Sequence, residues 1–115
     1  MYSENEIVWL YAIGCEQGPI KVGISADPHG RVLSIQTCCP FPIKLIYVRQ
    51  CGTRAEGVQH EESIQECYAE YRLRGEWFNF DFHMAAEAID MVIDTFEHFE
   101  FERRKAELQA GRVPQ

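Results

Sequence analysis

The stretch that decides the fold is Ile7–Gln36, IVWLYAIGCEQGPIKVGISADPHGRVLSIQ, which has the pattern of strand, turn, strand and helix. Residues 7–13 are apolar on both alternating faces, as in a strand that is covered on both sides. Residues 14–19 include two glycines and a proline, which favour a chain reversal. Residues 20–25 predict a second strand with two unlike faces. One face is apolar, and the other carries Lys21, Gly23 and Ser25.

The polar face of this second strand and the helix after it hold candidate functional residues. A lysine beside a glycine, which has no side chain, leaves room for a ligand on that face. Asp27 is expected to cap the helix by accepting backbone N–H bonds, and Pro28 suits the first helical position, where its missing donor costs nothing. The helix is predicted to run to about residue 36, with Arg31 in its first turns.

The next part of the chain predicts a third strand and a long helix. Residues 43–50 alternate between two faces and indicate a strand that is antiparallel to a neighbour. Thr53 and Glu56 have the spacing of a capping box, in which each side chain satisfies a helix N-terminal donor. The helix should run from there to about Arg74, and Gly75 is the expected left-handed residue that ends it.

Glu61 is the sharpest candidate on this helix. At about 100° per residue, Ile64 and Tyr68 lie on an apolar arc, and Glu61 falls inside that arc. An unpaired carboxylate there would be costly or would take up a proton, so it needs a cation, a hydrogen-bond donor or a metal. On position alone, a structural salt bridge to Arg31 or Lys21 and a functional site are equally well supported.

The C-terminal part predicts a second amphipathic helix. Residues 77–80 form either a short strand or a packed extended segment, and the helix runs over about residues 83–110. Its apolar stripe packs against the sheet or the long helix, or else it forms a surface for a protein partner or a homodimer. We therefore expect an α/β (α+β) fold with a small three-stranded antiparallel sheet flanked by helices and an added C-terminal amphipathic helix.

Length and composition restrict the class of protein. The 115 residues suit one domain, and five cysteines without a C-x-x-C pair argue against a zinc site. With no signal peptide or long apolar run, we expect a cytoplasmic protein without a membrane segment. The net charge is −7, and the surplus acid lies entirely in residues 61–115, which have thirteen acidic and six basic side chains. Strong sequence-independent DNA binding by the chain alone is therefore not expected.

Two short motifs and a closing block carry a family resemblance. The motifs are Trp9-Leu10-Tyr11 and Lys21-Val22-Gly23, and they are followed by a helix with Arg31. The closing block is Tyr71-Arg72-Leu73-Arg74-Gly75-Glu76-Trp77-Phe78. Together these residues resemble the GIY-YIG nuclease superfamily, and in particular a phage-associated branch that has Lys in the second motif. The resemblance covers about residues 7–80.

The resemblance implies a nuclease site made by four residues. Glu61 aligns with the family's metal-binding glutamate and would hold one Mg²⁺ or Mn²⁺. Arg31 would contact the scissile phosphate, Tyr11 would orient or deprotonate the attacking water, and Lys21 would supply a cation beside it. Substrate contacts are expected from Gly23, Ser25 and Asn79. The position where this branch often has His carries Gln65 here.

The sequence therefore predicts a magnesium-dependent endonuclease that hydrolyses DNA phosphodiester bonds. The main alternative is an inactive GIY-YIG-like module that binds nucleic acid or a protein partner. A small-molecule phosphodiesterase is a third reading, and it would have a narrow closed pocket. Convergence of Tyr11, Lys21, Arg31 and Glu61 would favour the enzyme, whereas a Glu61–Arg31 bridge sealed under apolar side chains would favour the inactive module.

Overall fold

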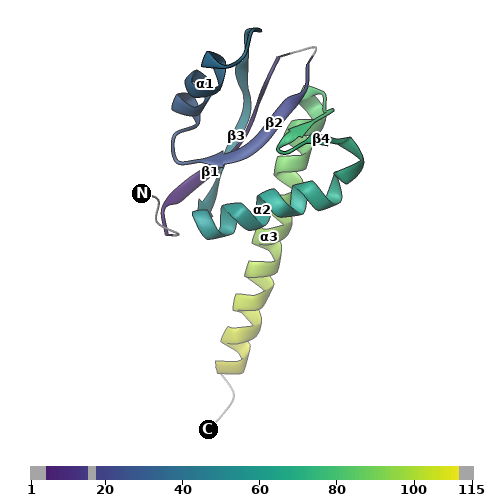
Figure 1. Cartoon of the computed structure of the whole chain (residues 1–115). Coiled ribbons are helices and arrows are strands. Elements are labelled where there is room, and N and C mark those ends of the chain that lie inside the picture. Colours follow the sequence, from purple (N-terminus) through teal and green to yellow (C-terminus); the bar gives the residue numbers. More distant parts are fainter. Residues whose placement is uncertain (1–4, 16–17, 112–115) are drawn as a thin grey trace.

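A sheet with helices on both sides makes up the protein in the computed structural model, which describes residues 5–15 and 18–111 (Figure 1). The strands are β1 (Ile7–Gly14), β2 (Ile20–Ser25), β3 (Lys44–Thr53), β4 (Arg72–Arg74) and β5 (Trp77–Phe78). The helices are α1 (Pro28–Thr37), α2 (Arg54–Cys67), a 3₁₀ helix (Ala69–Tyr71) and α3 (Phe82–Gly111). The predicted mixed α/β class is confirmed. The prediction of three strands is wrong, because β4 and β5 extend the sheet to five.

The strand order is β3-β1-β2-β5-β4, and every neighbouring pair is antiparallel. β1 lies between β2 and β3, and helices pack on both sides of it, which explains why both of its faces are apolar. β5 pairs only with the beginning of β2, at Ile20 and Lys21. The Val22 N–H donates to the carbonyl of Glu76, 3.0 Å away, and beyond this bond the outer edge of β2 has no strand partner in the described residues. The end of β2 is therefore open to side chains from other elements.

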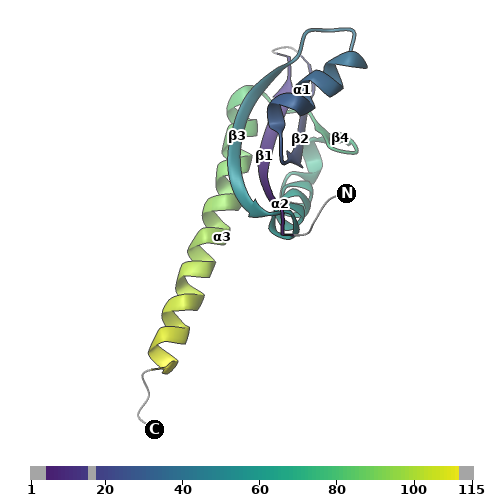
Figure 2. The same cartoon turned by 90° about the vertical axis from the view of Figure 1, so that its left-hand side faces the viewer.

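The two faces of the sheet are covered differently. One face packs on α2 and α3 and forms the apolar core, which includes Val8, Leu10, Ala12, Ile20, Val22, Ile64, Phe78, Ala85, Ile89 and Ile93. Figures 1 and 2 show α1 on the side of the sheet opposite to α3. Along β2, residues 20, 22 and 24 face the core helices, whereas residues 21, 23 and 25 lie on the α1 side.

The predicted helix starts are confirmed. The Asp27 carboxylate accepts a hydrogen bond from the Gly30 N–H at 3.1 Å, and Pro28 is the first residue of α1. At α2, the Thr53 hydroxyl accepts from the Glu56 N–H, and the Glu56 carboxylate accepts from the Thr53 N–H, so the capping box is complete.

The predicted end of α2 is wrong. The helix stops at Cys67 instead of Arg74, and the chain continues as the 3₁₀ helix and the edge strand β4. Gly75 does adopt a left-handed conformation, with φ of 57°, but in the turn between β4 and β5. The rings of Tyr68 and Tyr71 pack on Phe80. This packing and the β4–β5 pairing outweigh the local preference for helix, because they bury rings and satisfy backbone groups together.

α3 has an inner and an outer half. Its buried residues, Ala85, Ala88, Ile89, Val92 and Ile93, all lie in the first half and pack on the sheet. The second half extends beyond the sheet (Figures 1 and 2). Its apolar side chains Phe99, Phe101 and Leu108 are exposed by 67%, 63% and 64%. The predicted stripe therefore packs in the first half only. A search of the described helices finds none that is long and apolar enough to span a membrane.

Candidate active site

Tyr11 and Gly23 form the centre of the site. They are opposite each other in the β1–β2 pair, and Tyr11 is only 1% exposed. A Cβ atom at position 23 would lie 2.6 Å from the Tyr11 hydroxyl oxygen and 3.0 Å from Oε1 of Glu76. A side chain at this position would therefore displace the Tyr11 hydroxyl and push the Glu76 carboxylate outwards. The space that the sequence predicted for a ligand is thus occupied by the Tyr11 hydroxyl and the Glu76 carboxylate.

Arg31 reaches this centre from α1. Its guanidinium forms a side-chain hydrogen bond with Tyr11. Burial raises the pKa of Tyr11 above its ordinary value; the bond with Arg31 opposes this shift, while the negative charges of Glu76 and Glu61 add to it. The phenol is therefore protonated at neutral pH. In this state it can orient a water or a phosphate oxygen, but it is not a base.

Lys21 and Glu76 form an ion pair beside Gly23. Nζ of Lys21 lies 2.9 Å from Oε1 of Glu76, and the two side chains are 13% and 29% exposed. The ammonium also lies 6.0 Å from the ring centroid of Trp77. Lys21 is therefore not the exposed strand lysine that composition alone would favour. Its charge is held in a partly buried position on the α1 side of the sheet.

Glu61 enters the site from α2 at the open edge of β2. Its carboxylate accepts a hydrogen bond from the backbone of Ile24. Burial raises the pKa of Glu61 to about 7, the negative charge of Glu76 adds to the shift, and Lys21 opposes it. The sequence correctly predicted a half-buried carboxylate at this position.

The chemistry of the Glu61 carboxylate fits a magnesium ion. Burial and the nearby Glu76 make an ionised Glu61 unfavourable, so a divalent cation at Glu61 would be favoured in turn. One carboxylate, completed by waters and a substrate phosphate, is a common way to hold Mg²⁺. Within residues 5–15 and 18–111 there is no group of three or more His, Cys, Asp or Glu side chains that could hold a metal. A magnesium ion here would therefore have Glu61 as its protein ligand, with the rest of its shell supplied by water and substrate.

Comparison with known proteins places the chain in a family. The T5orf172 domain, a phage-associated domain, matches residues 8–97. The chain belongs to the T5orf172 domain family. The match spans β1 to the middle of α3 and includes every element that contributes to the site. No curated protein and no solved structure matches the chain. The phage-associated part of the predicted resemblance is confirmed, whereas the wider GIY-YIG assignment stays a prediction.

The T5orf172 domain does not bring every predicted residue to the site. The Ser25 hydroxyl accepts a hydrogen bond from the Asp27 N–H at 3.0 Å, in the turn that leads to α1. Asn79 follows β5, which runs antiparallel to β2 and away from Gly23. Asn79 is exposed, and its N–H donates to the Tyr71 carbonyl. Their substrate contacts stay predictions, and the geometry gives Asn79 no place beside Tyr11.

Glu76 is the site residue that sequence reasoning missed. It belongs to the closing block, but the sequence alone gives it no role of its own. The signal was its position directly after Gly75, because a left-handed turn residue redirects the chain and aims the next side chain across the strand pair. Sequence spacing could not show that this turn lies beside Gly23, because α2 was predicted to continue through it.

The charges around the site are unevenly placed. The first half of α3 packs on the face of the sheet opposite to α1, and two of its acidic side chains, Asp90 and Asp94, pair with Arg49 of β3 at 3.0 and 2.9 Å. Arg72 and Arg74, predicted at a helix end, are instead exposed on the edge strand β4. Part of the surplus acid is therefore paired on the far face of the sheet, while Glu61 and Glu76 are the acidic side chains at the site itself.

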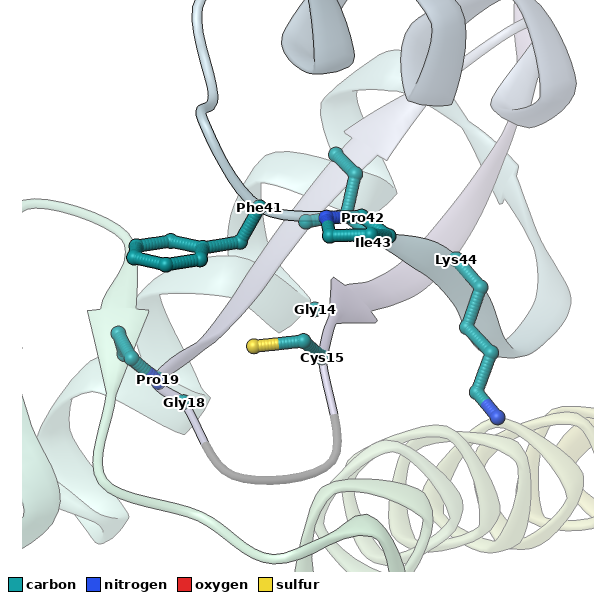
Figure 3. Close-up of a pocket in the computed structure, with 8 residues that line it drawn as sticks. All are labelled: Gly14, Cys15, Gly18, Pro19, Phe41, Pro42, Ile43 and Lys44. Carbon is teal, nitrogen blue, oxygen red and sulfur yellow. The ribbon is translucent and has the colours of Figure 1, made fainter.

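A separate pocket of about 590 Å³ lies at the far end of the β1–β2 hairpin (Figure 3). It is lined by Gly14, Cys15, Gly18, Pro19, Phe41, Pro42, Ile43 and Lys44. Its lining is mainly apolar, and Figure 3 shows the Lys44 side chain directed away from Phe41 and Cys15. The Lys44 ammonium lies 5.1 Å from the Phe82 ring centroid. This pocket does not suit a phosphate group, so it gives no support to the reading as a small-molecule phosphodiesterase.

Proposed function

We propose that this T5orf172 domain is a GIY-YIG-type endonuclease that hydrolyses DNA phosphodiester bonds with the help of Mg²⁺ or Mn²⁺. One observation carries the proposal. Four residues that the sequence assigned to such a site, Tyr11, Lys21, Arg31 and Glu61, come from four different elements and converge around Gly23. Membership of the T5orf172 family is consistent with a nucleic-acid-related function.

Hydrolysis forms one bond from water oxygen to phosphorus and breaks one ester bond, while the water loses a proton and the leaving oxygen gains one. Negative charge develops on the phosphate, so the reaction needs cationic donors near it. Arg31 offers a planar fork of N–H donors for two phosphate oxygens. Lys21 adds a second positive charge, and Glu61 would hold the metal ion, which would supply a Lewis acid and a more acidic water.

Tyr11 has a narrower role than the sequence suggested. Because its pKa is raised, mainly by burial, the hydroxyl keeps its proton in the metal-free protein. It would therefore orient the attacking water by a hydrogen bond, and the hydrogen bond with Arg31 helps to keep the phenol oxygen in place. A phenolate base would need more positive charge than Arg31 alone supplies, since Glu61 and Glu76 oppose ionisation.

The test is cleavage of supercoiled plasmid and of single-stranded and branched DNA in Mg²⁺ or Mn²⁺. We compare the wild type with Glu61→Gln and Arg31→Ala. The matched controls are Glu66→Gln, an exposed carboxylate on the same helix, and Arg104→Ala, an exposed arginine on α3. Each site variant should lose activity by about 10²-fold or more, because it removes a charge that stabilises the transition state. The controls should retain it.

The absence of cleavage by the wild type would decide against the endonuclease. If the folded wild type cuts none of these substrates with either metal, the endonuclease proposal fails. The alternative is then a non-catalytic module that binds nucleic acid or a protein partner, and the exposed Phe99, Phe101 and Leu108 of α3 are the first surface to test for a partner or a second copy.

A further inference from the structure

Glu76 is fixed to β2 at two points. Its carbonyl accepts the Val22 N–H at 3.0 Å, and its carboxylate pairs with the Lys21 ammonium at 2.9 Å. The tight turn at Gly75 brings it there, and the missing side chain at Gly23 gives the carboxylate its space. Because both its backbone and its side chain are held by β2, Glu76 has a more defined position than a residue in an ordinary surface ion pair.

The Lys21 ammonium acts on two carboxylates, those of Glu76 and Glu61. It forms its 2.9 Å contact with Glu76, and its positive charge also reaches Glu61, where it counteracts the effect of burial. The two carboxylates therefore compete for one ammonium. If Glu76 were neutral, the partly buried ammonium would turn to Glu61, because a buried charge without a partner is strongly unfavourable.

We propose that Glu76 is a positioning residue of this site, which holds the Lys21 ammonium beside Gly23 and keeps it off Glu61, so that the Glu61 carboxylate stays open to a divalent cation. The part that concerns the cation rests on the proposed function. The part that concerns the ammonium does not, because it follows from the ion pair alone. Glu76 acts through Lys21 and does not itself bind the metal.

The first experiment tests the ammonium without any metal. Melting temperatures are measured in EDTA for Glu76→Gln in the wild type and in the Glu61→Gln background. In the wild type, Lys21 can pair with Glu61 instead, so the loss is small. In the Glu61→Gln background it has neither carboxylate, so the melting temperature should fall further, by about 3 °C or more. Equal losses in both backgrounds would overturn the proposal.

The second experiment tests the cation, with Mn²⁺ affinity measured by titration calorimetry. Glu76→Gln should weaken Mn²⁺ binding by about tenfold in the wild type, because Lys21 then competes for Glu61. In a Lys21→Met background the same change should have less than about a twofold effect. A similar loss in both backgrounds would show that Glu76 acts on the metal directly, and no loss in the wild type would show that it does not act at all. Either result overturns the proposal.

Glu70→Gln, an exposed carboxylate on the 3₁₀ helix, is the matched control for both experiments. The two experiments also separate the two proposals. If the wild type neither binds Mn²⁺ nor cuts DNA, the endonuclease proposal fails, while the melting temperatures still decide where Glu76 places Lys21.

Discussion

Neighbouring residues of β2 serve opposite purposes. Ile20 and Val22 are 0% and 1% exposed and pack into the core on the α2 and α3 side. Lys21 and Gly23, one step along the same strand, form a charged cluster with Tyr11, Arg31, Glu61 and Glu76. The apolar face gains stability from burial, whereas the α1 face holds a glycine, a partly buried ion pair and a half-buried carboxylate whose ionised form is unfavourable. This arrangement is typical of a site selected for function.

The largest expected effect is on the core face of β2. Ile20→Ala should lower the free energy of unfolding by about 2–5 kcal/mol, because it leaves a cavity next to fully buried neighbours. Activity per folded molecule should be nearly unchanged. Urea denaturation and a cleavage assay on the same samples check both statements. A loss below about 1 kcal/mol would mean that this face is not the core.

The next effect is on the site face of the same strand. Gly23→Ala should cost about 1–3 kcal/mol, because the new methyl group meets the Tyr11 hydroxyl and the Glu76 carboxylate. Activity should fall with stability, since both side chains must move. Gly111→Ala is the control, because nothing lies within 4 Å of a Cβ there. If Gly23→Ala leaves unfolding and cleavage unchanged, the close approach at Gly23 is not required.

The sequence predicted those parts of the fold that depend on local patterns. The alternation of β1 and β2, the caps at Asp27 and Thr53, and the half-buried position of Glu61 could all be read within one or two turns of chain. For residues 77–80 the sequence left a short strand as one of two alternatives, and β5 lies there, but β4 was not predicted. β4 and β5 are only three and two residues long, and they depend on tertiary contacts: pairing with each other and with β2, and the packing of the neighbouring rings of Tyr68, Tyr71 and Phe80.

The same limit explains the missed site residue. Four predicted side chains converge around Gly23 because strand periodicity and helix angle fix which way they face. Glu76 reaches the site only through the β4–β5 turn, so its role depends on a tertiary pairing that no local pattern shows. Asn79 follows the closing block in sequence, but it lies after β5, which runs away from Gly23, and its role as a substrate contact stays a prediction.

Glu61→Gln should make the protein more stable while it abolishes cleavage. The pKa of Glu61 is raised to about 7, mainly by burial, so above about pH 7 its ionised form is less favourable in the folded state than in the unfolded chain. The variant should gain about 1–2 kcal/mol near pH 8 in EDTA, and almost nothing near pH 4, where the carboxyl is protonated in the folded protein. Chemical denaturation at the two pH values tests this. A destabilised variant near pH 8 would show that Glu61 is a structural ion-pair residue.

The smallest effect concerns His60, the neighbour of Glu61 on α2 that faces the core. It is 3% exposed, and its ring meets Phe96 edge-on at 5.0 Å. Burial lowers the pKa of His60, and the charges of Glu56 and Glu97 only partly oppose this. The unfolded chain therefore binds a proton more readily than the folded protein. The stability contributed by neutral His60 is present above about pH 6.5, and it is lost as the pH falls from there through the lower pKa of His60 in the folded protein.

In His60→Gln the fall in stability between about pH 7 and pH 5 should be smaller than in the wild type by about 0.5–1 kcal/mol. His83→Gln, at a side chain that is 92% exposed, should follow the wild type. Identical pH profiles for His60→Gln and the wild type would mean that protonation of the buried ring costs the fold nothing, and the contrast between the two neighbours on α2 would then rest on Glu61 alone.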